Sequence, residues 1–208
     1  MRFPSPLRVV ALISGGGRTV LNLLDRIEAG QLPVQVELVV ANKPCSGIER
    51  IQQRGIPVEL MQRSSFAGAV EQNAAIFNRI RQTSAYGILL AGYLARIEIP
   101  DDFLHRVINI HPSLIPAFCG KGMFGEHVHA AAIQRGCKVS GCTVHFCDNE
   151  YDHGPIIMQQ TVPVLDDDTA ESLAARVFEA ECEAFPGALL KLMQDDFEVD
   201  GSRVLFRS

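Results

Sequence analysis

The chain has 208 residues, of which 47% are hydrophobic and 21% charged, a composition that indicates a globular protein and excludes disorder. A formal net charge of -5 argues against a nucleic-acid or anionic-membrane surface as the main partner. No apolar run approaches the roughly 18 residues that a bilayer span needs, and the start MRFPSP lacks the build of a signal peptide. We therefore expect a cytoplasmic protein without a membrane partner.

The first predicted elements are a strand, a glycine loop and a helix. An apolar run at 8–14 ends in three glycines, and apolar residues then recur at helical spacing from Val20 to Ile27. Free backbone N–H groups and the positive end of the helix dipole meet at such a loop, so it is a candidate phosphate site, with a simple tight turn as the alternative. A dinucleotide site is less favoured because Val20 occupies the third glycine position. The candidate phosphate-binding residues are Gly15, Gly16, Gly17, Arg18 and Thr19.

Strand and helix patterns alternate along most of the remaining chain. The predicted strands cover 36–41, 56–61, 86–91, 107–110, 138–147 and 156–164, the predicted helices cover 47–54, 65–82, 127–135 and about 169–194, and a hairpin about an Asp200-Gly201 turn closes the chain. This alternation predicts an α/β fold with an open, twisted, mostly parallel sheet and helices on both faces, in three layers. We see no repeat or linker, so residues 1–208 are expected to form a single domain.

Two polar residues stand near the end of the strand predicted at 107–110. Proline at position 112 stops that strand, so His111 lies at its carboxyl end, where open α/β sheets bind ligands. Asn109 lies two residues earlier and projects to the same side if both are extended. The pair could hold a carbonyl oxygen and handle a proton. The alternative is that His111 only caps the next turn.

The loops beside this strand carry further candidates. Apolar residues at 92–97 are either core or a slot for a flat heterocycle. The glycine-rich run at 117–126 reads as a mobile lid. His127 and His129 could bind a metal, but no cysteine or acid cluster joins them, so a capping or solvated pair is favoured and no metal is expected.

The second half of the chain adds three polar positions. His145 is expected on one face of the strand 138–147 with Thr143, pointing into a cleft or lying on a covered face of the sheet. The acidic loop 148–155 contains Asp152, and its pattern alone fits a solvated hairpin connection. Glu181 interrupts an apolar helix stripe, as either a boundary residue or a carboxylate that meets an amine.

Several motifs taken together resemble one family. These are LISGGG at 12–17, LAGY at 90–93, NIHPSL at 109–114, GCTVHF at 141–146 and YDHGPII at 151–157. In this order and at this chain length they resemble the phosphoribosylglycinamide formyltransferases. The most specific signal is N-x-H-P-S-L followed some forty residues later by D-x-G-P-I-I.

The resemblance implies transfer of a formyl group from 10-formyltetrahydrofolate, as co-substrate, to the amine of glycinamide ribonucleotide in purine biosynthesis, by a monomer or homodimer that uses small-molecule substrates and no metal. It implies that Asn109, His111 and Asp152 are catalytic, with Asp152 favouring the imidazolium. His145 and Glu181 join the glycine loop in binding the nucleotide. The implied folate-binding residues are Leu94, Ala95, Arg96, Ile97, Asn149 and Tyr151.

The sequence departs from the family at a few positions. Arg18 and Thr19 replace the more usual residues of the glycine loop, and Phe178 stands where relatives often have Lys or Gln. Ala95 stands where arginine is frequent, with Arg96 one place later. The alternatives are an amino-sugar formyltransferase, a 10-formyltetrahydrofolate hydrolase, or a non-catalytic nucleotide-binding module.

Overall fold

The computed structural model describes residues 1–207. The chain packs as two compact units, an N-terminal unit (Phe3–Ile108) and a C-terminal unit that starts at Asn109 and includes Met1 and Arg2. The border between them falls inside strand β5 (Val107–His111). The single domain expected from the sequence stays a prediction.

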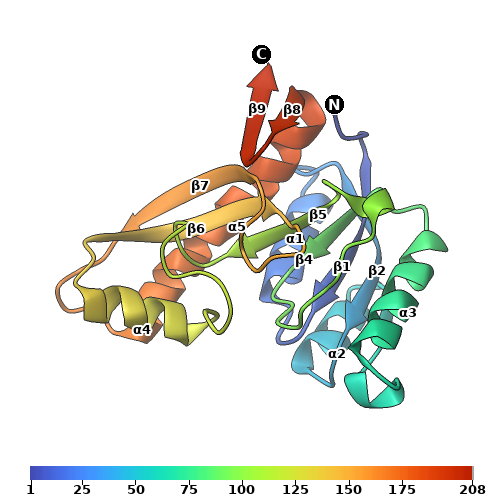
Figure 1. Cartoon of the computed structure of the whole chain (residues 1–208), viewed down its shortest axis with the longest axis horizontal. Helices are drawn as coiled ribbons and strands as arrows, with labels where there is room; N and C mark the ends of the chain where they lie inside the picture. Colours follow the sequence, from blue (N-terminus) through green and yellow to red (C-terminus); the bar gives the residue numbers. More distant parts are fainter. Residues whose placement is uncertain (208) are drawn as a thin grey trace. The chain divides into compact units, whose positions relative to one another are not determined.

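The N-terminal unit is a parallel sheet with helices (Figure 1). Strand β1 pairs with β2 on one side and β4 on the other, and β2 pairs with β3, all in parallel. Residues 9–13 are fully buried, which is why the strand reads as a continuous apolar run. The elements are β1 (Leu7–Ile13), α1 (Arg18–Glu28), β2 (Val34–Ala41), α2 (Ser46–Gln52), β3 (Val58–Leu60), α3 (Ala69–Arg81) and β4 (Gly87–Leu90), with short 3₁₀ helices at Arg63–Ser65 and Asp101–Phe103.

The strand order places helices on both faces of this sheet. The order is β3-β2-β1-β4, so the chain moves outward from β1 to β3 and then returns to the other side of β1. Because parallel crossovers are right-handed, connections that run in opposite directions put their helices on opposite faces. Helices α1 and α2 therefore share one face, where they contact each other, and α3 covers the other. The three layers expected from the sequence are confirmed in this unit.

Strand β3 and helix α3 are each shorter by three residues or more than the sequence predicted. Strand β3 keeps only Val58–Leu60, since Pro57 has no N–H for the ladder. The helix expected from position 65 begins at Ala69, because Gly68 is extended and serves as its N-cap, and the preceding residues form the 3₁₀ turn. The apolar pattern did not separate these turns from the helix.

The C-terminal unit has a mixed sheet backed by a long helix. Strands β6 (Val139–Phe146) and β7 (Ile156–Pro163) are antiparallel, β7 pairs in parallel with β9 (Arg203–Arg207), and β9 is antiparallel to β8 (Asp196–Asp200). Helix α5 (Ala170–Gln194) packs along β6 and β7 and contacts α4 (Glu126–Arg135). Pairing in this unit is therefore mainly antiparallel, whereas the pairs described for the N-terminal unit are all parallel; taken over the chain, the α/β class and the mostly parallel pairing are confirmed.

Local interactions determine where helix α5 begins and how the terminal hairpin turns. Thr169 caps α5 through a reciprocal capping box with Ser172. The terminal hairpin is confirmed, but its two-residue loop is Gly201-Ser202, one place later than predicted, since Asp200 still pairs with Arg203. Gly201 takes a φ of 57° there, which glycine allows. None of the helices within residues 1–207 has the length and apolar content to cross a membrane.

Candidate active site

His111 is the last residue of β5 and is almost completely buried, with 4% of its surface exposed. The turn that follows it is held by Thr143 of β6, which is fully buried. The Thr143 hydroxyl donates to Ser113 O (2.7 Å) and accepts from Ile115 N (3.0 Å) and from Gln159 Nε2 (3.0 Å). The first two of these hydrogen bonds hold the turn that follows His111, and the third joins Thr143 to β7.

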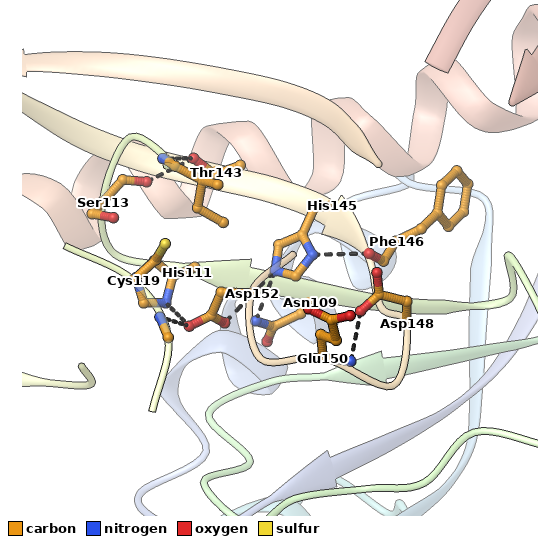
Figure 2. Close-up of polar contacts among 12 residues, drawn as sticks. Asn109, His111, Ser113, Cys119, Thr143, His145, Phe146, Asp148, Glu150 and Asp152 are labelled. Atoms are coloured by element: carbon orange, nitrogen blue, oxygen red, sulfur yellow. Dashed lines mark hydrogen bonds and ion pairs between the residues drawn. The ribbon is translucent and has the colours of Figure 1, made fainter. Parts of the chain in front are cut away.

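Asp152 lies beside His111, although the two are far apart in sequence. The distance from His111 Nδ1 to Asp152 Oδ2 is 3.5 Å, and the distance from His145 Nε2 to Asp152 Oδ1 is 3.9 Å. Figure 2 shows the carboxylate between the two imidazoles. The meeting of Asp152 with His111 that the motifs implied is therefore present in the structure, within one unit.

The loop that carries Asp152 folds back over the end of β6. A side chain at Gly154 would place its Cβ 2.0 Å from Phe146 O, so only glycine fits there. Asp148 holds the start of the loop by accepting from Glu150 N (2.8 Å) and pairing with His153 Nδ1 (2.8 Å), and this carboxylate raises the pKa of His153. The D-x-G spacing of the motif thus has a steric reason.

Asn109 is oriented by His145. The His145 Nδ1 atom lies 2.9 Å from Phe146 O, a group that can only accept, so Nδ1 carries the proton. Burial lowers the pKa of His145 and keeps the ring neutral, so its Nε2 atom accepts from Asn109 Nδ2 at 3.1 Å. One amide N–H of Asn109 is thereby engaged, and the direction of its oxygen is fixed (Figure 2).

The glycine-rich segment 117–126 contacts His111 and Asp152 through its backbone. The sequence predicted a mobile lid here but not these contacts. His111 Nε2 lies 3.0 Å from Phe118 O, and Gly120 N donates to Asp152 Oδ2 at 2.8 Å. Both ring nitrogens of His111 therefore face acceptors, the arrangement that suits a doubly protonated imidazole. No sequence pattern identifies a backbone carbonyl as a site group.

The two histidines of the H-x-H pair separate. His127 is exposed and packs edge-on against the Phe124 ring, whereas His129 is buried on α4. Neither caps the helix, whose N-cap is Gly125 with no side-chain bond, so the capping interpretation is wrong and only His127 is solvated. Burial lowers the pKa of His129, and the charge of His111 lowers it further. Within residues 1–207, His129 Nδ1 is one of a few buried polar atoms without a hydrogen-bond partner.

The other candidates in the C-terminal unit lie near its surface. Asn149 and Tyr151 are exposed on the loop before Asp152. Glu181 is half-buried on α5, and its charge adds to the burial that raises the pKa of Cys142 to about 12. Among the described residues no three His, Cys, Asp or Glu side chains form a group that could hold a metal ion.

The glycine loop of the N-terminal unit precedes α1, as predicted. Gly17 is the N-cap at a φ of 68°, and the helix begins at Arg18, which is exposed. The loop is supported from α2: Arg50 Nη1 donates to Gly16 O (3.0 Å), and a Cβ at Gly47 would lie 2.5 Å from Gly15 O. The backbone of the glycine loop is thus held close against α2.

The loop at 92–97 meets the glycine loop within the same unit. Ser14 N donates to Gly92 O (3.0 Å), and Leu94 N donates to Ser14 Oγ (2.9 Å). Leu94 and Arg96 are exposed, Ala95 is half-buried and Ile97 is buried. Ser14 was not singled out from the sequence, although it directly precedes the glycines. The carboxyl ends of β1 and β4 therefore present both predicted ligand loops side by side.

The chain matches the formyl transferase family over residues 7–189. It is 39% identical over 181 residues to the chloroplastic phosphoribosylglycinamide formyltransferase of Vigna unguiculata, covering 86% of this chain and 58% of that protein. It is 31% identical to the phosphoribosylglycinamide formyltransferase of Haemophilus influenzae, covering 86% of this chain and 84% of that protein.

A solved structure gives the same result in three dimensions. Glycinamide ribonucleotide transformylase 1 from Symbiobacterium toebii superposes with a TM-score of 0.90 at 34% identity, covering 97% of this chain and 94% of that one. A formyltetrahydrofolate deformylase from Burkholderia mallei superposes with a TM-score of 0.83 at 26% identity, covering 97% of this chain and 70% of that one. The family resemblance indicated by the sequence motifs is thus confirmed, and the chain belongs to the formyl transferase family.

Proposed function

We propose that this protein transfers a formyl group from 10-formyltetrahydrofolate to the amine of glycinamide ribonucleotide. The observation that carries the proposal is the distance of 3.5 Å between Asp152 and the buried His111, which ends the strand that also holds Asn109. The proposal is further supported by relatives named phosphoribosylglycinamide formyltransferase and glycinamide ribonucleotide transformylase.

The reaction exchanges one carbon–nitrogen bond for another. The acceptor amine attacks the formyl carbon, a new C–N bond forms, and the carbonyl oxygen becomes negative. Collapse of this tetrahedral species breaks the bond between the formyl carbon and the folate nitrogen. One proton leaves the amine and one is delivered to that nitrogen, so protons and electrons balance without an oxidant or a metal.

Asn109 and His111 would stabilise the negative oxygen. The amide of Asn109 has two N–H groups, of which one donates to His145, so the other is available to an oxyanion. A protonated His111 supplies a second donor and a positive charge, and the nearby Asp152 carboxylate favours that charge. Donors held in place before the reaction stabilise charge without reorganisation at the moment that it forms.

Proton movement would also use this pair. His111 can pass its proton to the departing folate nitrogen and take one from the amine, directly or through a water molecule. The Asp152 carboxylate faces Nδ1 of the same ring at 3.5 Å, so it lies beside the positive charge that the ring carries before it passes on its proton. The neutral His145 does not compete for this proton, because burial lowers its pKa.

The glycine loop and the loop at 92–97 would bind the two substrates. Gly15–Gly17 with Arg18 and Thr19 at the start of α1 suits a ribonucleotide phosphate, because backbone N–H groups and the helix dipole favour an anion. We assign the folate ring to Leu94–Ile97 with Asn149 and Tyr151, and the substrate amine to Glu181. The oligomeric state and the cytoplasmic location stay predictions, and the Vigna relative is named as chloroplastic.

The test is to incubate the protein with 10-formyltetrahydrofolate, with and without glycinamide ribonucleotide, and to follow the folate absorbance. Loss of formyl-folate only in the presence of the nucleotide supports the proposal. Loss without the nucleotide would instead show the deformylase reaction, for which the same His–Asp pair could activate water. No loss in either case would leave a binding module and contradict the proposal.

A further inference from the structure

The backbone of Phe118–Gly120 closes on the two groups proposed for proton transfer. Phe118 O accepts from His111 Nε2 at 3.0 Å, and Gly120 N donates to Asp152 Oδ2 at 2.8 Å. The two contacts lie on either side of Cys119, so a three-residue stretch spans the pair. We call this stretch, residues 118–120, the clasp.

The clasp is held in a conformation that costs free energy. Among residues 1–207, three non-glycine residues have a positive φ, and two of them belong to this contact: Phe118 at 49° and Asp152 at 53°. The left-handed conformation is disfavoured for residues with a Cβ, and more strongly for Phe118 than for Asp152, because Asp tolerates it better than an aromatic residue. Backbone strain of this kind persists where surrounding contacts hold it, and it gathers at elements that change conformation.

The Phe118 carbonyl accepts a hydrogen bond from the same N–H group of His111 that the proposed reaction requires. His111 Nδ1 faces Asp152, so Nε2 is the ring N–H that can reach a formyl oxygen, and in this structure that N–H already has a carbonyl acceptor. We propose that the Phe118 carbonyl is an internal stand-in for the formyl oxygen, so that the clasp must release His111 before 10-formyltetrahydrofolate can bind productively. This inference rests on the proposed function.

The hydrogen bonds of the closed clasp stabilise the protein while no ligand is bound. An imidazole N–H that is buried without an acceptor destabilises the protein, and the Phe118 carbonyl provides that acceptor while no ligand is present. Gly120 likewise orients the Asp152 carboxylate toward His111. Binding of formyl-folate then exchanges one carbonyl acceptor for another, and the strain at Phe118 favours the exchange.

Two substitutions should shift the clasp in opposite directions. Gly120 has a φ of 92° with no atom within 4 Å of an added Cβ, so Gly120→Ala adds left-handed strain without a clash and weakens the clasp. Phe118→Asn places a residue that tolerates positive φ at a strained position and strengthens it. Gly122→Ala is the matched control, because Gly122 has a φ of 90° and equally open surroundings in the same segment but does not donate to Asp152.

The experiment measures the dissociation constants of 10-formyltetrahydrofolate and tetrahydrofolate for these variants by calorimetry, in the absence of nucleotide. Amide hydrogen exchange at residue 120 reports clasp opening independently. When a closed state excludes the ligand, the apparent dissociation constant equals the intrinsic constant divided by the fraction of protein that is open. We expect about fivefold tighter binding of the formyl compound in Gly120→Ala and weaker binding in Phe118→Asn, with Gly122→Ala unchanged.

Tetrahydrofolate lacks the formyl oxygen, so its binding should respond little to either substitution. Equal affinity of the formyl compound across the variants, or equal exchange at residue 120 in Gly120→Ala and Phe118→Asn, would overturn the clasp while leaving folate binding intact. If neither folate bound the unaltered protein, the proposed function would fail, and the role of the clasp with it.

Discussion

The glycine loop of the N-terminal unit and the His111–Asp152 pair of the C-terminal unit both lie at strand ends, but they differ in what they present. The glycine loop offers backbone N–H groups and an exposed arginine at a helix start. The His111–Asp152 pair consists of side chains with 5% and 13% of their surface exposed, which contact one another. Exposed backbone donors suit binding of an anion, whereas buried, mutually oriented titratable groups suit charge stabilisation. The difference predicts that substitutions at the two regions affect different kinetic constants.

The largest expected effect comes from Asp152→Asn. Loss of the negative charge removes the group that favours a protonated His111, so the turnover number should fall on the order of 10²–10⁴-fold with little change in nucleotide binding. Steady-state kinetics with varied glycinamide ribonucleotide measures the turnover number and the KM for the nucleotide. Asp148→Asn is the control, since Asp148 lies in the same loop and forms hydrogen bonds with Glu150 and His153. An unchanged turnover number in Asp152→Asn would remove this carboxylate from the mechanism.

A smaller effect is expected at His145, which orients Asn109 without meeting the reacting atoms. His145→Phe removes the Nε2 acceptor at 3.1 Å and frees the amide to rotate, so turnover should fall about tenfold. His145→Gln can restore an acceptor and should recover part of this loss. Equal turnover numbers in the two variants, at equal thermal stability, would show that the contact with Asn109 does not affect turnover.

Arg18→Ala tests the glycine loop. Loss of one charge-assisted contact to phosphate should raise the KM for the nucleotide about tenfold and leave turnover within about twofold. Arg81→Ala is a suitable control, because Arg81 pairs with Asp102 on the surface of the same unit. If turnover fell while KM stayed the same, the contrast between a binding region and a reaction region would be wrong.

The smallest expected effect is a change of the folding stability with pH. Burial lowers the pKa values of His105, His129 and His145, so the folded state binds fewer protons than the unfolded state below a pH of about 6.5. Stability should therefore fall as the pH drops below that value, by at most about 1.4 kcal/mol per pH unit for each such histidine. The exposed His153, whose pKa Asp148 raises, acts in the opposite direction.

Thermal unfolding between pH 5 and pH 7.5 measures this dependence. His129→Gln removes one of the buried titrating rings and should make the slope shallower, while His127→Gln, at an exposed position of the same helix, should not. Identical slopes in the unaltered protein and His129→Gln would contradict the neutral, buried state inferred for His129.

The sequence by itself determined the fold class and the main candidates at strand ends. Parallel strands that are buried on both faces read as unbroken apolar runs, and a proline or a glycine triplet marks where they end, so His111 and the loop at 15–17 could be placed from the chain alone. Boundaries were less certain where the pattern is weak, as at Gly68 and Gly201. The link between His111 and Asp152 came from the family motifs, because no local pattern joins residues that are forty positions apart.

Only the tertiary structure decided which polar atoms meet. The neutral state of His145, the burial of His129 and the steric need for glycine at 154 depend on residues brought together from separate strands and loops. The contacts of Phe118 and Gly120 were beyond the reach of the sequence, since every residue but proline carries the same N–H and every residue the same C=O. A backbone group becomes part of a site only through the conformation that aims it.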